Sequence, residues 1–189
     1  MDRLELEKRM DRIIDWVKVC DTKTSIMLSV IAVLLTIVFT SDIAVGSISE
    51  IVMRMFDRQY CFYDGINVIG IFSLLLLLIT CVTSIVSIVH FVKVLYAKTN
   101  EKQFGDQHFT DSLIHFHHIS SIDFDKFMTE IESYSDASWN QDLLSQIHIN
   151  AKRCNEKFND YNEGIWWLAA TVILGLFTIL LFIVYFVVY

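Results

Sequence analysis

The sequence predicts an all-α membrane protein with three transmembrane helices and a mostly helical cytoplasmic module. Hydrophobic residues make up 54% of the 189 residues and the mean hydropathy is +0.47, so much of the chain suits lipid as well as water. The chain has no proline and six glycines, which favours long uninterrupted helices. Three apolar runs approach or exceed the roughly 20 residues that a helix needs to cross a bilayer.

The N-terminal segment is predicted to be a charged helix that runs directly into the first apolar run. Acids and bases alternate over residues 1–24, unlike the short positive region of a cleavable signal, and we expect no such signal. Asp21 falls within the apolar stripe of this helix, and a carboxylate on a buried face needs a partner. We therefore expect Asp21 either to pair with a Lys or Arg of the cytoplasmic module, or to contact a ligand or line a gate. Lys23 lies on the opposite flank and is expected to reach the headgroups. The stripe consists of Leu6, Met10, Ile13, Val17 and Cys20.

The three apolar runs differ in length. The first, residues 26–39, is short, so its polar ends should lie near the headgroups. The second, from residue 66 to about 96, is longer than a bilayer requires and must tilt or protrude. The third, residues 165–189, carries aromatic side chains at both ends, as interfacial belts do. These aromatic residues are Trp166, Trp167, Tyr185 and Tyr189.

The distribution of Lys and Arg predicts the orientation of the spans. Six precede the first span, two lie in the 41–65 connection, and seven lie from Lys93 to Lys157. The positive-inside rule then places the N-terminus and the long polar segment in the cytoplasm, and the C-terminus outside. The predicted segments are a cytoplasmic N-terminal helix (1–24), a first span (25–41), an extracytoplasmic loop (42–65), a second span with a cytoplasmic extension (66–96), a cytoplasmic sensor segment (97–163) and a third span (164–189).

The polar segment has its own start and stop signals. SLIHFHHIS, residues 112–120, is ambiguous between strand and helix. Residues 120–123 predict the start of an amphipathic helix, which SYSDAS at 133–138 should end. Ser138 to Gln141 fit a capping box that opens a helix running without interruption into the third span. Two of the three spans are thus expected to continue into the cytoplasm as helices.

Polar side chains fall within one sector of this last cytoplasmic helix. Arg153 and Lys157 are one turn apart and could hold a phosphate, while Gln146 or Asn150 could read a base edge or a ribose. The alternative is a solvated helix face. We expect Asp142 to be a coupling charge, together with Asp21 and Lys23. The members of the sector are Asp142, Gln146, Asn150, Arg153, Lys157 and Asp160.

Small and hydroxylated residues align on one face of each span. Such faces favour close helix packing, and the alternative is a lining for water or ions in an assembly of subunits. No charge lies deep in any span, which argues against a proton-coupled transporter. The aligned residues are Ser25, Ser29, Thr36 and Thr40 in the first span, Ser73, Thr80, Ser84 and Ser87 in the second, and Gly164, Thr171, Gly175 and Thr178 in the third.

Several functional classes are not favoured. A net charge of −7 argues against nucleic acid as a partner. We find no nucleophile with a base, no paired catalytic carboxylates and no glycine-rich phosphate loop, so neither enzyme activity nor a cofactor is expected. The four cysteines are expected to be unpaired thiols, with a Cys61 cross-link between subunits as the alternative. A histidine cluster lacks recurrent Cys or acid partners, so no metal site is expected. The cluster is His108, His115, His117 and His118.

Three stretches together resemble the transmembrane effectors of Pycsar antiphage systems. They are WVKVCDTKTSIMLSVIAVLL at 16–35, IHFHHISSIDFDKFMTEI at 114–131 and DLLSQIHINAKRCNEKF at 142–158. The chain departs from the family pattern at Cys20, where a small residue is usual. It departs again at His117 and His118, where a glycine is often found.

The resemblance implies a function that composition does not. A pyrimidine cyclase makes cUMP or cCMP during phage infection, and the effector binds this ligand in its cytoplasmic part. It then impairs the bacterial inner membrane and halts the infected cell. The implied protein is a multi-pass homo-oligomer with its C-terminus in the periplasm, and the lipid bilayer is its target. The alternatives are an effector gated by a different cyclic nucleotide and a constitutive membrane scaffold that recruits a partner protein.

Overall fold

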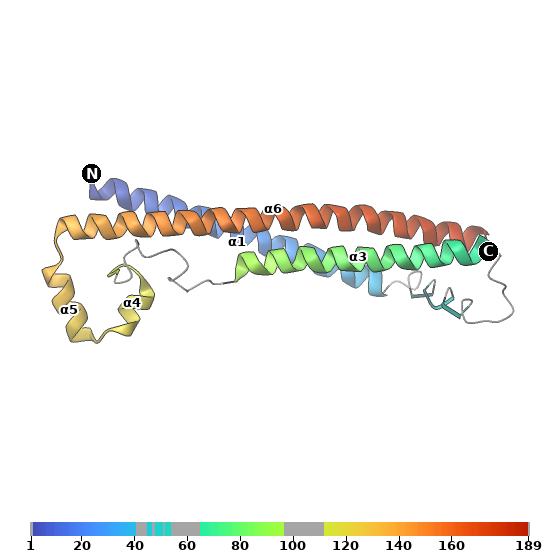
Figure 1. Cartoon of the computed structure of the whole chain (residues 1–189), viewed down its shortest axis with the longest axis horizontal. Helices are drawn as coiled ribbons and strands as arrows, with labels where there is room; N and C mark the ends of the chain where they lie inside the picture. Colours follow the sequence, from blue (N-terminus) through green and yellow to red (C-terminus); the bar gives the residue numbers. More distant parts are fainter. Residues whose placement is uncertain are drawn as a thin grey trace. The chain divides into compact units, whose positions relative to one another are not determined.

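The computed structural model describes residues 2–40, 45–46, 48–50, 52–53, 65–96 and 112–188, and every regular element in these ranges is a helix (Figure 1). The predicted all-α class is therefore confirmed for these residues. Most of the predicted extracytoplasmic loop, including Cys61, lies outside them, as does His108. The main helices are α1 (Arg3–Thr40), α3 (Gly65–Leu95), α4 (Phe116–Ser121), α5 (Phe124–Ser133) and α6 (Asp136–Val188).

Three helices are long and apolar enough to cross a membrane. They lie at Arg3–Ile37, Val68–Leu95 and Asp136–Tyr185, within α1, α3 and α6. The three predicted spans are thus confirmed as candidate membrane helices of a multi-pass protein. The side of the membrane on which each connecting segment lies stays a prediction.

Helices α1 and α6 extend well beyond their apolar parts. The 38 residues of α1 and the 53 residues of α6 form uninterrupted helices, as the lack of proline predicts. At 1.5 Å of rise per residue, α6 is roughly 80 Å long, compared with a hydrocarbon core of about 30 Å. The predicted continuity between charged and apolar segments is therefore confirmed for both helices.

The polar segment differs from prediction at the start of α6. The helix begins at Asp136 because Ser135, and not Ser138, is its N-cap. The Ser135 hydroxyl accepts the Ser138 N–H at 3.1 Å, and the Ser135 carbonyl accepts the Trp139 N–H at 2.9 Å. The capping box predicted at Ser138 is therefore wrong by one turn. The ambiguous stretch before residue 120 forms a turn followed by α4, and α5 begins after Asp123 as predicted.

The chain divides into two compact units. Unit 1 consists of Met1–Thr22 and Val94–Asn159, and unit 2 of Lys23–Lys93 and Asp160–Tyr189. Unit 1 therefore holds the charged part of α1, the short helices α4 and α5, and the polar part of α6. Unit 2 holds α3 and the apolar parts of α1 and α6. That unit 1 is cytoplasmic stays a prediction.

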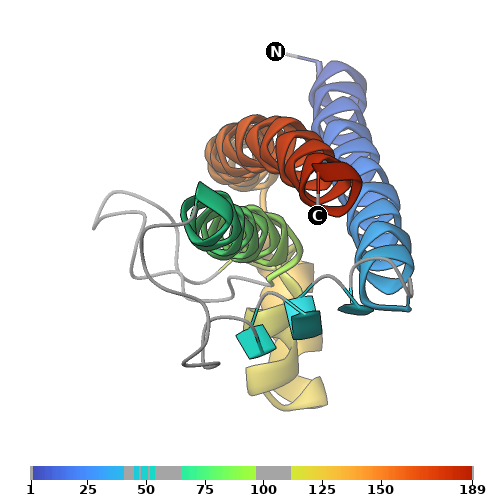
Figure 2. The same ribbon diagram turned by 90° about the vertical axis from the view of Figure 1, so that its right-hand side faces the viewer.

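Within unit 2, hydroxyl groups join α3 to α6, which lie side by side (Figure 2). The Ser87 hydroxyl donates to the Gly164 carbonyl at 2.8 Å, and the Thr171 hydroxyl donates to that of Thr83 at 3.0 Å. A Cβ atom on Gly164 would come 2.8 Å from the Phe91 ring, so this crossing needs glycine. Close packing of the small-residue faces is thus present between α3 and α6, whereas a pore lining stays a prediction.

The aligned hydroxyls of α1 behave differently. Ser29, Thr36 and Thr40 are exposed and donate to carbonyls one turn earlier in their own helix. A hydroxyl that satisfies itself in this way can face lipid without a partner helix. Among the described residues, Ser29, Thr36 and Thr40 therefore make no hydrogen bond to another helix of the kind that Ser87 makes to Gly164.

Replacing Gly164 by alanine tests the close crossing. Helix propensity favours alanine over glycine by about 1 kcal/mol, so Gly175→Ala is expected to be neutral or stabilising, because its new Cβ would lie 3.8 Å from Thr80. Gly164→Ala must displace the fully buried Phe91 ring and should fall below Gly175→Ala in unfolding free energy by about 1–3 kcal/mol. Unfolding in detergent micelles measures both variants. Equal stability of the two would contradict the crossing.

Candidate functional site

A buried line of polar side chains runs along α6 in unit 1. Asp142 is 0% and Gln146 3% exposed, and the residues that follow at one-turn spacing are half-buried. Because a helix repeats every 3.6 residues, these side chains share one face. The solvated-face alternative is therefore wrong, most clearly for Asp142 and Gln146. We call this line the polar stripe; it consists of Asp142, Gln146, Asn150, Arg153 and Lys157.

The apolar stripe of α1 packs in the same unit. Leu6 and Cys20 are fully buried, and Met10, Ile13 and Val17 are half-buried, as the helical spacing predicted. The half-buried Asn150 amide donates to the Gln146 carbonyl at 2.9 Å and also contacts the Met10 sulfur, a weak acceptor, at 3.7 Å. Through this contact, the apolar stripe of α1 meets the polar stripe of α6. Such a local mismatch is typical of functional sites.

Asp21 and Lys157 form an ion pair between the two helices. The Lys157 Nζ lies 2.5 Å from Asp21 Oδ1, with side-chain exposures of 21% for Lys157 and 37% for Asp21. Of the two alternatives for Asp21, pairing with a lysine of the same unit is the one present. Lys157, predicted to bind a phosphate, is engaged by a carboxylate. Lys23 is exposed, on the flank opposite Asp21 as predicted, and its contact with headgroups stays a prediction.

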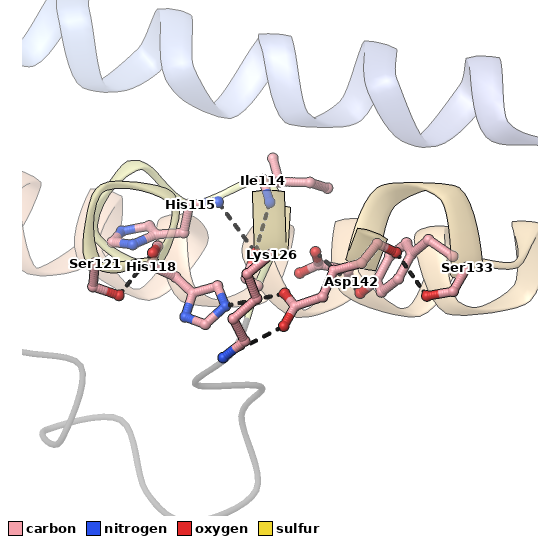
Figure 3. Close-up of polar contacts among 10 residues, drawn as sticks. Ile114, His115, His118, Ser121, Lys126, Ser133 and Asp142 are labelled. Carbon is pink, nitrogen blue, oxygen red and sulfur yellow. Dashed lines mark hydrogen bonds and ion pairs between the residues drawn. The ribbon is translucent and has the colours of Figure 1, made fainter. Parts of the chain in front are cut away.

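Asp142, at the other end of the polar stripe, is a buried carboxylate (Figure 3). Burial raises its pKa more than the facing Ser112 hydroxyl and the N–H groups of Leu113 and Ile114 lower it. The Tyr134 hydroxyl donates to Oδ2 at 3.5 Å, while within the described chain no group reaches Oδ1 in hydrogen-bonding geometry. Burial and the Asp142 carboxylate in turn raise the pKa of Tyr134. Asp142 is thus held among polar groups without a cation in contact.

Sequence reasoning missed two neighbours of Asp142. The Ser112 hydroxyl accepts the N–H groups of Ile114 and His115, both at 3.2 Å, and so shapes the turn that faces the carboxylate. Tyr134 follows α5 and also contacts the Trp139 ring edge-on at 5.8 Å. No periodic pattern relates residue 112 to residue 142. Only the cluster of polar and aromatic residues after 133 could have suggested Tyr134.

Asp160 of the predicted polar sector and His118 of the histidine cluster make contacts away from the polar stripe. Asp160 belongs to unit 2, where its carboxylate lies 3.4 Å from His90. His118 lies 3.9 Å from Glu130 of α5. Within the described ranges, no three His, Cys, Asp or Glu side chains gather as metal ligands. The His117 side chain lies outside the described part of the structure.

Comparison with known proteins identifies the family. Residues 65–185 match the Pycsar effector protein domain. The chain belongs to the Pycsar effector family. This Pycsar effector is 28% identical over 178 residues to the Pycsar effector protein GmPycTM of Gulbenkiania mobilis, a similarity that covers 89% of this chain and 87% of that protein. No solved structure matches the chain significantly. The resemblance found in the sequence is therefore confirmed.

The raised pKa of Asp142 predicts how stability depends on pH. A folded-state pKa above the unfolded value means that the native protein binds a proton more readily, so the carboxylate costs stability as pH rises through the folded pKa. Asp142→Asn should remove this cost. Its melting temperature relative to the unchanged protein should be highest above neutral pH and fall as the buffer is acidified. The exposed Asp125→Asn is the control, and a pH-independent difference for Asp142→Asn would argue against a buried charge.

A double-mutant cycle tests the Asp21–Lys157 pair. Both side chains are partly solvated, so the coupling energy in unfolding free energy should be modest, about 0.5–1 kcal/mol in low salt, and smaller in high salt. The cycle combines Asp21→Asn with Lys157→Ala. The matched control is Asp15→Asn with Lys18→Ala, an ion pair exposed by 72% and 71%, whose coupling should be close to zero. Equal coupling in the two cycles would contradict a structural role for the pair.

Proposed function

We propose that this Pycsar effector binds a cyclic pyrimidine mononucleotide, cUMP or cCMP, in unit 1 and then disrupts the bacterial inner membrane, halting the infected cell. Membership of the family supports signalling by a cyclic nucleotide. The observation that carries the proposal is the polar stripe, in which Asp142 and Gln146 are buried and the half-buried Asn150 meets the Met10 sulfur of α1. Burying polar groups without full partners costs free energy, so a ligand that completes their hydrogen bonds stabilises the site.

Each member of the stripe has a proposed part. Arg153 holds the phosphate, and the amides of Gln146 and Asn150 read the base or the ribose. The predicted role of Lys157 is revised, since it already pairs with Asp21. An incoming phosphate competes with the Asp21 carboxylate for this lysine. Asp21, Lys157 and Asp142 are then coupling charges whose contacts change when ligand binds.

The ligand must act on the membrane through the helices. Helix α6 carries the polar stripe and continues through its apolar part, and α1 does the same with Asp21. The proposal places unit 1 in the cytoplasm and the C-terminus in the periplasm, with the small-residue faces available for assembly of several copies. Moving such a switch from 1:99 to 99:1 needs roughly 10⁴-fold preference of the ligand for the active state. In an assembly of several copies that each bind one ligand, each ligand supplies only part of this preference. The functional partner is a pyrimidine cyclase, which acts on the effector only through its nucleotide product.

Titration calorimetry on the detergent-solubilised full chain tests the ligand. cUMP or cCMP should bind, whereas cAMP and cyclic dinucleotides should not. Arg153→Ala should weaken binding at least about tenfold, because it removes a charge-assisted contact to phosphate. Lys152→Ala is the matched control, since the neighbouring cation is exposed and off the polar stripe.

The outcomes separate the alternatives. Selective binding of another cyclic nucleotide would reassign the effector to a different signal. Binding of none of them would leave the scaffold alternative and end the sensor proposal. In cells that express the cyclase, dye uptake should occur with the unchanged chain and with Lys152→Ala, and should be lost with Arg153→Ala.

A further inference from the structure

Helix α5 presents an apolar face that the described residues of unit 1 leave exposed. None of its residues is buried, and Phe124, Met128 and Ile131 are exposed by 71%, 41% and 38%. These side chains recur at three- and four-residue spacing, so they lie on one side of the helix. We call them the α5 face. Contiguous exposed apolar side chains of this kind mark interaction sites.

The α5 face has acidic edges. Asp123, Asp125 and Glu132 are exposed beside it, and within the described residues none of the three forms an ion pair. The cation of this helix, Lys126, falls on the opposite side by helical spacing and lies 3.7 Å from Glu130. A partner for this face must therefore be apolar and positively charged.

The acidic edges argue against a lipid surface as the occupant. Helices that lie on membranes carry Lys and Arg beside their apolar face, and the cytoplasmic leaflet is negative. Carboxylates at Asp125 and Glu132 would be repelled by such a surface. A protein surface with the opposite charge removes this repulsion and gains from desolvating the three apolar side chains.

Helix α1 offers a surface with the required chemistry. Trp16 and Val19 are exposed by 58% and 42%, and Lys8 and Arg12 are exposed on the same side of the helix. Neither cation forms an ion pair with the described residues, in contrast to Arg9, which pairs with Glu5 at 2.7 Å. We call Lys8, Arg12, Trp16 and Val19 the α1 face. It lies on a different side of α1 from the stripe that packs inside unit 1, although the Trp16 ring also meets the Phe158 ring of α6 edge-on, with centroids 6.1 Å apart.

We propose that the α5 face of one copy docks on the α1 face of a second copy. Both faces are exposed within one copy, so neither covers the other there. The contact joins two different surfaces, so each copy keeps one face for a further neighbour, and the rotation between neighbours decides whether the assembly closes into a ring or extends as a filament. The contact rests on the surfaces of unit 1 and does not depend on which nucleotide binds.

Directed cross-linking tests the contact. Full-length chains with Met128→Cys and with Trp16→Cys, carrying different tags, are co-expressed and purified in detergent without nucleotide, with cUMP and with cCMP. Under a short thiol cross-linker, the mixed pair should exceed either like pair by at least about tenfold in one of these samples. Lys126→Cys replaces Met128→Cys as the matched control on the far side of α5. The unsubstituted chain gives the background from its native cysteines.

Charge reversal supplies an independent readout. Asp125→Lys with Glu132→Lys should reduce the assembly size seen by light scattering, as should Lys8→Glu with Arg12→Glu, and mixing the two variants should restore it. Cross-links between two Met128→Cys chains alone would overturn the proposal in favour of a symmetric α5–α5 contact. A polarity-sensitive dye at Met128→Cys that responds to vesicles, without cross-links, would assign the face to lipid. Absence of mixed cross-links in all samples would also overturn it, even where calorimetry shows ligand binding.

Discussion

The structure depends on one constraint: α6 is a single helix, and the same side of it is buried in the polar unit 1 and in the apolar unit 2. Gln146, Gly164 and Phe182 are spaced by 18 residues, which is about five full turns, and all three are buried. The face that carries the polar stripe therefore continues as the face that packs in unit 2. Backbone hydrogen bonds along the helix keep these three positions on one side of α6.

Several contacts involve residues close in sequence to the positions where α1 and α6 pass from unit 1 into unit 2. Asp21 and Lys157 are within three residues of the last residues that α1 and α6 contribute to that unit. In unit 2, the next turn of α6 holds Asp160 against His90 and the Tyr161 ring against Phe91, with the ring centroids 6.0 Å apart. Ser87 and Gly164 follow. Polar side chains thus supply contacts within each unit on either side of this point in the sequence.

Local chemistry made most of the helices predictable. Hydropathy and the lack of proline indicated α1, α3 and α6, and helical periodicity placed Asp21 on a buried face, because both signals are contained within a few turns. The inward direction of the polar stripe was not predictable, since polarity alone favours a solvated face. Ser112 and Tyr134 were missed for a similar reason. Their contacts with Asp142 depend on how separate segments fold together. Ser135 caps α6 in place of the expected Ser138, because its hydroxyl comes one turn earlier.

The ion pair between Asp21 and Lys157 joins residues 136 positions apart in sequence. Unit 1 is built around that long separation, because α1 is synthesised well before the polar part of α6. A growing chain that ends before α6 contains the first two apolar helices but not the polar stripe or the partner of Asp21. Contacts so distant in sequence form late and slowly. Unit 1 therefore cannot close on the Asp21–Lys157 pair until the polar part of α6 has been synthesised.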